Sequence, residues 1–145
     1  MQWLWFPKLG RFSNIYGGGL ILQFNKAKHM SNLVKEFNDY RTKMNEVILS
    51  KDNLVIKRLW NLDTNTYAAG ALDVKTKELL GLVASMVLRC DDCIKYHLGK
   101  AHELGVNTEE MYEVFAVANI VGGTIVIPHT RRAAEYWEEL KGNIQ

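Results

Sequence analysis

The sequence predicts an all-α fold, and two features of the chain lead to this prediction. After residue 30, apolar residues recur at intervals of three and four, which is the spacing of one face of an α-helix. The segments are separated by turn residues, such as Gly105 and the pair Gly122–Gly123. The β-branched stretch 125–127 lies between two helical patterns and directly before Pro128, so we interpret it as a buried helical turn rather than a strand.

The length and composition of the chain fit one globular domain. At 145 residues it is long enough to bury a core, and its 48% hydrophobic and 23% charged residues are ordinary values. A net charge of +2 without a basic stripe gives no reason to expect a nucleic acid partner. We find no apolar run long enough to span a membrane, and two cysteines do not make a secreted disulfide framework. We therefore expect a cytoplasmic protein that binds neither nucleic acid nor membrane.

Residues 1–29 differ from the rest of the chain. They are rich in aromatic residues and glycine, contain no acidic residue, and lack the order of residues that a secretory signal needs. We interpret 1–29 as an N-terminal extension. It either precedes a working protein that starts at Met30 or packs on a neighbouring subunit. Residues 30–145 are then the helical domain.

The first helix is expected from a cap at Ser31 to about residue 49, with an apolar stripe on one side and charged residues on the other. A short second helix is expected over 54–60. Residues 61–66 read N-L-D-T-N-T, which is rich in turn formers. Residues 67–72 have helix propensity again, apart from one glycine.

Asp73 is the expected cap of a central helix that runs to about residue 89. No charge occurs over 79–88, and apolar residues surround the helix axis, so we expect this helix to be buried. Glu78 then stands at the edge of, or inside, an apolar environment, which raises the pKa of a carboxyl group. Alternatively, Glu78 is an exposed carboxylate that pairs with Lys75 or Lys77.

Three more helices complete the expected fold. One covers 91–104 and ends at a C′ glycine. Thr108, followed by two glutamates, opens the next, which extends to about residue 121. The last begins at about 124 or 129 and ends near 140. Several aromatic residues are expected to be available for a subunit interface: Trp60, Tyr112, Phe115, Tyr136 and Trp137.

Both cysteines of the chain, Cys90 and Cys93, form a C-x-x-C pair, and His97 follows one helical turn later. On a helix of about 100° per residue, the two sulfurs and the imidazole share one face, whereas Asp91 and Asp92 point elsewhere. Two adjacent thiols can form a disulfide, and a neighbouring base can produce the thiolate, which is the reactive form. The pattern is typical of a redox site.

Two other interpretations of the cysteine pair compete with this one. The cysteines are small buried residues, or they bind zinc with His97 and either Glu78 or His102. A structural zinc site normally takes its ligands from two separated pairs, and the chain has no second pair. His102 also falls away from the cluster on the helical wheel. We interpret His102 and His129 as structural or solvated, and we expect no metal and no cofactor.

The spacing from Glu78 to His97, E-x11-C-x-x-C-x3-H, resembles that of the alkylhydroperoxidase D (AhpD)-like proteins of the carboxymuconolactone decarboxylase superfamily. The resemblance covers about 54–140, including the glycine pair and the stretch I-P-H-T-R-R-A. It implies an all-α AhpD-like subunit that assembles as a homo-oligomer, a trimer or a hexamer. It also implies a thiol-dependent peroxidase or disulfide reductase that acts on hydroperoxides. The superfamily's true decarboxylases lack the cysteine pair, so decarboxylase-type activity is disfavoured.

The resemblance also implies a role for each residue of the motif. Cys93 is the peroxidatic cysteine, His97 removes its proton with help from Glu78, and Cys90 resolves the sulfenic acid into a disulfide. A lipoyl-bearing or thioredoxin-like protein then reduces this disulfide. AhpD carries a histidine where this chain has Asp92. The acidic pair opposes a nearby thiolate, whereas a helix N-terminus favours it, and the sequence leaves this balance open. A zinc-binding or redox-sensing oligomer without catalysis is the alternative.

Overall fold

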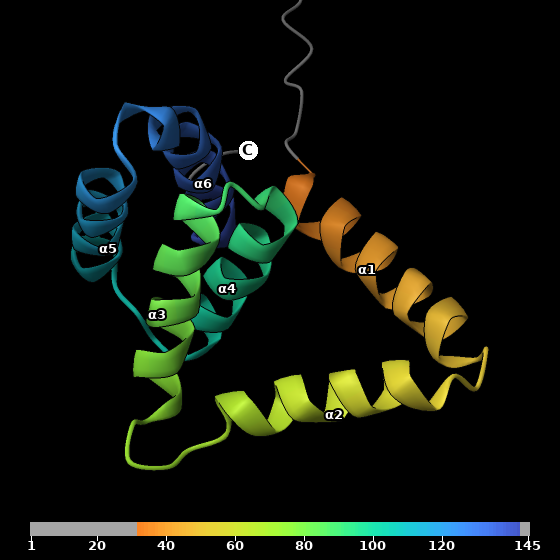
Figure 1. The fold of residues 1–145 in the computed structure, drawn as a ribbon. Helices are drawn as coiled ribbons and strands as arrows, with labels where there is room; N and C mark the ends of the chain where they lie inside the picture. Colours follow the sequence, from red (N-terminus) through yellow and green to blue (C-terminus); the bar gives the residue numbers. More distant parts are fainter. Residues whose placement is uncertain (1–31, 143–145) are drawn as a thin grey trace, which may run out of the picture.

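The computed structural model describes residues 32–142, and their regular structure is entirely helical (Figure 1). The elements in chain order are α1 (Leu33–Leu49), α2 (Leu54–Tyr67), α3 (Val74–Val87), α4 (Asp91–Glu103), α5 (Thr108–Gly122), the short 3-10 helix η1 (Thr124–Val126) and α6 (Ile127–Leu140). The expected all-α class is confirmed. The N-terminal segment 1–29 lies outside the described residues.

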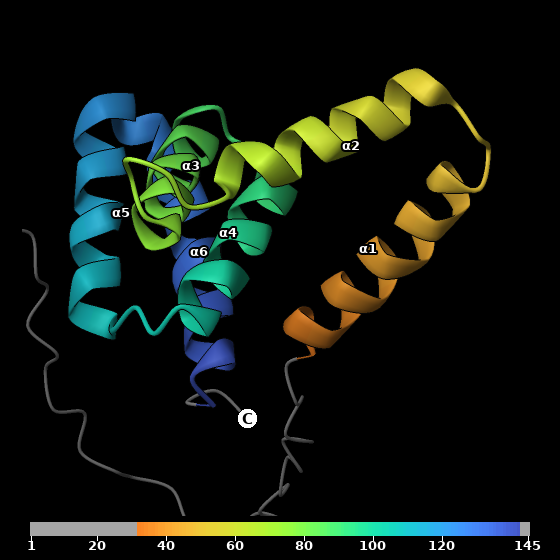
Figure 2. The same ribbon diagram turned by 90° about the horizontal axis from the view of Figure 1, so that it is seen from below.

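Helices α3 to α6 form the packed part of the molecule, which we call the four-helix core (Figures 1 and 2). Helix α3 packs against α4 and α5, and α4 packs against α6. The centre of the core is filled by side chains with almost no exposed surface: Leu82, Met86, Leu98, Met111, Val126, Tyr136 and Trp137. The burial of these side chains removes most of the core's apolar surface from water, which is the main stabilising term for the fold.

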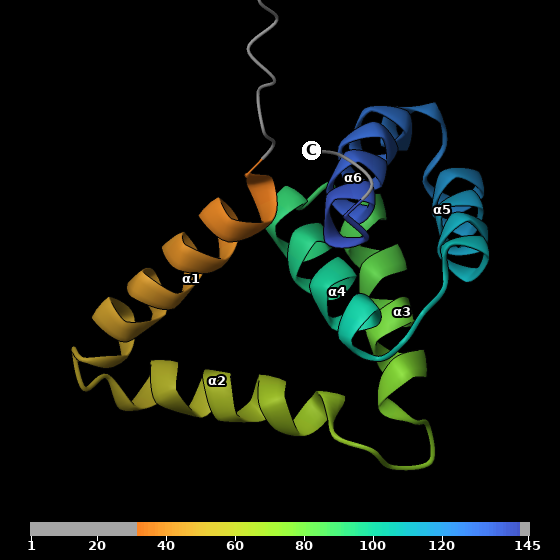
Figure 3. The ribbon, with the colours of Figure 1, turned by 180° about the vertical axis from the view of Figure 1, so that it is seen from behind.

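Helices α1 and α2 form a V that projects from the core: α1 runs away from the core, α2 runs back toward α3, and the two meet at their connection, as Figures 1 and 3 show. Helix α1 packs against α6 and α4, whereas α2 meets the rest of the molecule mainly at α3. Phe37 is the one buried residue of α1, and α2 has none. We call these two helices the α1–α2 pair.

Local capping explains where the core helices begin. The side chain of Asp73 accepts a hydrogen bond from the backbone N–H of Thr76 at 2.6 Å, so the expected cap of α3 is confirmed. The expected cap of α5, Thr108, is off by one residue, because Asn107 is the cap and Thr108 is the first residue of the helix. Asn107 and Glu110 form a reciprocal capping box that satisfies two N–H groups at the helix end.

The second helix is longer than the sequence predicts. It continues through the turn-rich residues to Tyr67, so both its expected end at 60 and the expected turn over 61–66 are wrong. The side chains of Thr64, Asn65 and Thr66 donate to carbonyl groups one helical turn earlier and therefore do not compete with the helix. Residues 68–72, for which the sequence indicates helix propensity, form the connection to α3.

Two expectations about burial also require correction. The rest of the described chain does not cover helix α3 on all sides. Leu80 is 57% exposed, whereas Leu82 on the core side is fully buried. Phe115, Tyr136 and Trp137 lie in the core, so they are not available for a subunit interface. Their rings fill the space between α4, α5 and α6. A small helical domain needs such large buried side chains to be stable.

The stretch 125–127 is helical, as predicted: η1 leads directly into α6. Gly123 before it has φ +76°, a conformation that favours glycine. A Cβ atom at Gly122 would lie 2.4 Å from Val126, so this position also requires the smallest residue. Among residues 32–142, no helix combines the length and apolar character needed to cross a membrane.

Candidate active site

The cysteine pair lies at the N-terminus of α4. Cys90 precedes the helix as its cap, and Cys93 lies in the first turn. The two residues form a disulfide with a Cα–Cα distance of 5.3 Å. Cys90 Sγ also accepts a hydrogen bond from the backbone N–H of Cys93, at 3.4 Å. Cys93 is exposed, whereas Cys90 is half-buried, so Cys93 is the cysteine that a reactant reaches more easily.

The chain makes a sharp turn between α3 and α4, just before the cysteines. Arg89 has φ +61°, which is unusual for a residue other than glycine. The backbone N–H of Cys90 donates to the carbonyl of Ser85 at 3.0 Å and ties this turn to α3. This connection brings the N-terminus of α4, and with it the disulfide, next to the end of α3.

Glu78 of α3 and His97 of α4 form a buried pair. His97 Nδ1 lies 2.7 Å from a carboxylate oxygen of Glu78, and both residues are less than a tenth exposed. The expectation that Glu78 lies among apolar residues agrees with its 3% exposure. When Nδ1 carries a proton and donates a hydrogen bond to the carboxylate, the second ring nitrogen of His97, Nε2, is free to accept a proton.

Glycine at position 81 allows α3 to approach the ring of His97. A Cβ atom at Gly81 would lie 2.6 Å from His97 Cε1 and 2.5 Å from the hydroxyl of Tyr67. The rings of Tyr67 and Tyr96 flank the imidazole, with centroids at 5.4 and 5.2 Å. Burial, and then the charge of Glu78, raises the pKa of both tyrosines, so both remain neutral phenols near neutral pH.

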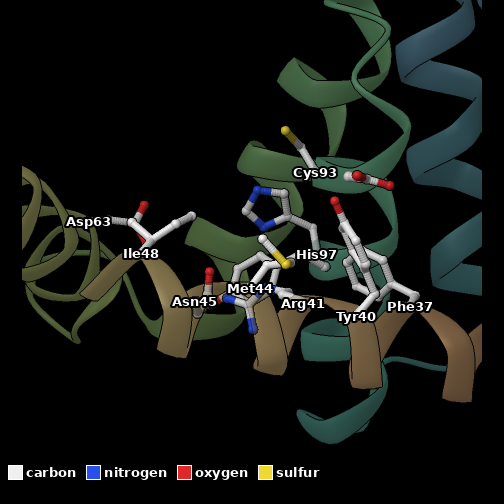
Figure 4. Close-up of a pocket in the computed structure, with 11 residues that line it drawn as sticks. Phe37, Tyr40, Arg41, Met44, Asn45, Ile48, Asp63, Cys93 and His97 are labelled. Atoms are coloured by element: carbon white, nitrogen blue, oxygen red, sulfur yellow. The ribbon is translucent and has the colours of Figure 1, made fainter. Parts of the chain in front are cut away.

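A cavity of about 470 Å³ opens in front of Cys93 and His97 (Figure 4). In Figure 4 the ring of His97 lies between Cys93 and the side chains of α1, with a ring nitrogen turned toward Cys93. The cavity is formed by residues of α1, α2 and α4: Phe37, Tyr40, Arg41, Met44, Asn45, Ile48, Asp63, Asp92, Cys93, Tyr96 and His97. The α1–α2 pair thus supplies one wall and the core supplies the sulfur and the imidazole.

A second cavity of about 420 Å³ adjoins Glu78. It is lined by Glu78, Tyr67 and Tyr96, together with charged residues at the end of α4. His97 faces the first cavity and Glu78 faces the second. The buried pair therefore has one member at each cavity, and Asp63 and Tyr96 line both cavities.

The two acidic residues between the cysteines have separate partners. Asp91 contacts His129 Nδ1 at 2.7 Å and Arg132 Nη2 at 3.1 Å, both on α6. Asp92 is more exposed and lies 3.5 Å from Lys95. No spacing signal in the sequence links His129 to Asp91, because the two residues are 38 positions apart in the chain. Asp91 and its partners became visible only in the folded structure.

The structure does not bring His102 to the site. Its ring packs edge-on against Trp137, with centroids 5.8 Å apart. The cysteines are joined to each other, so neither sulfur is a thiolate that could bind zinc in this state. Among residues 32–142, no group of three or more histidine, cysteine and carboxylate side chains is arranged to hold a metal ion.

The family of the chain follows from comparison with known proteins. Residues 54–136 match the family model described as the carboxymuconolactone decarboxylase family. This match covers more than half of the sequence, from α2 through most of α6, and includes the disulfide and the Glu78–His97 pair. The chain therefore belongs to the carboxymuconolactone decarboxylase family.

Solved structures agree with this assignment. A crystal structure of a Thermotoga maritima protein is 52% identical, with a TM-score of 0.70, and the match covers 74% of this chain and 91% of that one. That protein is described as a family member with a suggested part in the antioxidative response. A second crystal structure of the same protein gives 54% identity, a TM-score of 0.72, and coverage of 74% of this chain and 95% of that one.

Two further proteins extend the comparison. A carboxymuconolactone decarboxylase family protein from Legionella pneumophila is 24% identical with a TM-score of 0.67, and the match covers 79% of this chain and all of that one. At that identity it supports the fold alone. Uncharacterized protein 4 in the cox locus of Paracoccus denitrificans is 30% identical over 76 residues, which are 52% of this chain and 68% of that protein.

Proposed function

We propose that this protein is a thiol-dependent peroxidase and disulfide reductase, with Cys93, Cys90, His97 and Glu78 as its catalytic residues. The observation that carries the proposal is the buried Glu78–His97 pair, which opens onto the same cavity as Cys93. An exposed sulfur, a base beside it and a carboxylate that orients the base are what an activated thiol nucleophile requires. The antioxidative role suggested for the Thermotoga maritima relative points in the same direction.

In the first step, the reduced Cys93 sulfur attacks the outer oxygen of a hydroperoxide. His97 takes the thiol proton, and Glu78 stabilises the imidazolium that forms. The O–O bond breaks, the sulfur is oxidised to sulfenic acid, and the leaving alkoxide takes up a proton to become an alcohol. Glu78 lines the second cavity, and in this mechanism the pair exchanges its protons with solvent there.

In the second step, the Cys90 sulfur attacks the sulfur of the Cys93 sulfenic acid. Water leaves and the Cys90–Cys93 disulfide forms. Cys90 is suited to this role because its place at the N-terminus of α4 favours the thiolate form. An external dithiol then reduces the disulfide by exchange, so that one hydroperoxide and one dithiol give one alcohol, one water and one external disulfide.

The reductant is a protein dithiol, either lipoyl-bearing or thioredoxin-like, of the kind that a reducing cytoplasm supplies. Cys93 is exposed and lines the cavity, so a partner's sulfur can approach it. The rate of hydroperoxide consumption is measured with a lipoyl-bearing protein and with a thioredoxin-like protein at equal concentration, with hydroperoxide in excess. The class that gives the faster turnover is the reductant.

Cysteine variants test the proposal directly. Cys93→Ser should abolish hydroperoxide consumption, because it removes the nucleophile. Cys90→Ser should complete one turnover and then accumulate the Cys93 sulfenic acid or a mixed disulfide, which mass spectrometry of the intact protein detects. Turnover by Cys93→Ser at the wild-type rate defeats the proposal, and so does the absence of any oxidised adduct in Cys90→Ser.

We also propose that the chain acts as a homo-oligomer, a trimer or a hexamer. Apolar side chains remain exposed on α2 and around the end of α5: Leu54, Val55, Leu59, Leu62, Val117, Ile120, Val121 and Ile125. Patches of this kind mark protein interfaces in soluble proteins. Light scattering should give three or six times the chain mass, and Ile120→Glu should lower it. A monomer at micromolar concentration would contradict the assembly without affecting the redox proposal.

A further inference from the structure

A network of three charged or polar side chains connects the start of α4 to the start of α6. Asp91 directly follows Cys90 in the sequence and is the first residue of α4. His129 and Arg132 lie three residues apart on α6, so both side chains can face Asp91. His129 Nδ1 is 2.7 Å from Asp91 Oδ1, and Arg132 Nη2 is 3.1 Å from Asp91 Oδ2.

The hydrogen bonds of the network have one consistent arrangement. Arg132 Nη2 also lies 2.9 Å from His129 Nδ1. An unprotonated Nδ1 could accept from Arg132, but it would then face the carboxylate oxygen of Asp91 at 2.7 Å as a second acceptor, and two acceptors cannot bond to each other. His129 Nδ1–H therefore donates to the Asp91 carboxylate, and the guanidinium of Arg132 donates to the same carboxylate. Partial burial alone would raise the pKa of Asp91, but the hydrogen bonds and charges of His129 and Arg132 outweigh it and lower the pKa.

This arrangement bears on the chemistry of the neighbouring sulfur. Reduction of the disulfide adds two electrons and two protons, and one of the resulting thiols must lose its proton to react. An unpaired carboxylate beside Cys90 would oppose that thiolate, and the helix N-terminus would favour it. Arg132 compensates the charge of Asp91, so a thiolate at Cys90 has an ion pair with no net charge as its neighbour rather than a lone carboxylate.

We propose that Asp91, His129 and Arg132 are positioning residues that set the reduction potential of the Cys90–Cys93 pair. They pair the carboxylate beside Cys90 with a cation of α6 and thereby keep the reduced state accessible to a dithiol. The inference builds on the redox role proposed above, but it concerns the equilibrium between disulfide and dithiol. It therefore stands or falls separately from peroxide turnover.

The test is the equilibrium constant between the full-length protein and dithiothreitol buffers, with reduced protein quantified by thiol labelling. Arg132→Met removes the guanidinium from Asp91 and leaves only the hydrogen bond from His129, so the dithiol state should be disfavoured by about threefold to fivefold, the size expected for an exposed ion pair. Asp91→Asn removes the anion and leaves the cation, so it should favour the dithiol state by a similar factor. The double variant should lie close to wild type.

The opposite signs distinguish this proposal from a purely structural role, because a lost contact would shift Arg132→Met and Asp91→Asn in the same direction. Arg131→Met is the matched control. It removes the same charge one position earlier on α6, from a side chain that makes no ion pair within residues 32–142, and should leave the constant unchanged. His129→Leu should disfavour the dithiol state, and His129→Asn, which keeps a donor, should restore it.

Three outcomes overturn the inference: shifts of the same sign in Arg132→Met and Asp91→Asn, an Arg131→Met shift as large as that of Arg132→Met, or no shift in either network variant. Circular dichroism of each variant verifies folding. Should Arg132→Met fail to fold, the test still stands on Asp91→Asn, His129→Leu and His129→Asn, because the direction of the shift is predicted for each of them. Predicted shifts in a protein without peroxidase activity would support the network and reject the proposed function alone.

Discussion

The four-helix core and the α1–α2 pair contribute to the same cavity in different ways. The core holds the disulfide, the Glu78–His97 pair and nearly all of the fully buried side chains. The α1–α2 pair contributes one buried residue, Phe37, yet it supplies more than half of the side chains around the cavity. In the proposed mechanism, the reacting groups need fixed distances between them, whereas the wall that contacts a substrate tolerates variation. The two regions differ in packing accordingly.

The largest expected effect concerns stability in the core. Trp137 is fully buried, so Trp137→Ala should reduce the free energy of unfolding by about 3–5 kcal/mol at any protein concentration. Leu59→Ala on α2 removes a side chain that is 58% exposed in the single chain. Its effect should appear only at concentrations where copies associate. Urea unfolding at two concentrations measures both. A large, concentration-independent loss in Leu59→Ala would erase the distinction between the two regions.

The second effect tests the contact between α3 and the ring of His97. Gly81→Ala forces a Cβ atom into His97 and Tyr67, so it should reduce stability by about 1–3 kcal/mol and peroxide turnover by about tenfold or more. Gly99→Ala is the matched control, because a Cβ atom there meets nothing within 4 Å and alanine favours the helix by about 0.5–1 kcal/mol. Thermal unfolding and steady-state assays measure both variants. Equal activity in the two would show that the fit at position 81 is irrelevant.

A smaller effect is expected at the cavity wall formed by α1. Met44→Ala should lower kcat/KM for cumene hydroperoxide relative to hydrogen peroxide by about threefold to tenfold, because only the larger substrate contacts this apolar side chain. Val47→Ala, also on α1 but not part of the cavity, should leave the ratio unchanged. If the two variants change the ratio equally, the α1–α2 pair does not form the substrate wall.

The smallest effect is a pH dependence at the surface of the core. Hydrogen bonds from Lys75 and from the backbone of Asn107 lower the pKa of Glu110 below its ordinary value of 4.5. A depressed carboxyl pKa contributes stability that is complete above the ordinary value and is lost as pH falls through the folded value. Glu110→Gln should therefore lower Tm near pH 6, and this difference should shrink below pH 4.5. Glu109→Gln, whose carboxylate makes no ion pair within the described residues, should show no such trend. A difference for Glu110→Gln that is the same at both pH values would contradict the expectation.

Sequence periodicity predicted the helices well where their capping residues were clear, as for Asp73 and for Gly105 after α4. It failed at residues 61–66, because the same Asn and Thr side chains that favour turns also bond back to the helix. It also failed for the outward side of α3, where Leu80 is exposed. An apolar helix surface looks the same in the sequence whether its own chain or another copy covers it.

The candidate site shows the same limit at the level of single residues. The spacing of Cys93 and His97 was visible because a helix brings such positions to one face, and Cys90 lies directly before that helix as its cap. The contact of Asp91 with His129 was not, because it depends on how α4 and α6 pack. Local patterns thus located the cysteines and the imidazole, and only the tertiary structure revealed the charges around them.

The most direct test of the account is the rate at which reduced protein reacts with a hydroperoxide in a single turnover, measured by stopped flow. If the Glu78–His97 pair serves Cys93, His97→Gln and Glu78→Gln should each slow this step by about a hundredfold. His102→Gln, on the same helix but packed against Trp137, should react at the wild-type rate. Wild-type rates in His97→Gln would contradict the central claim.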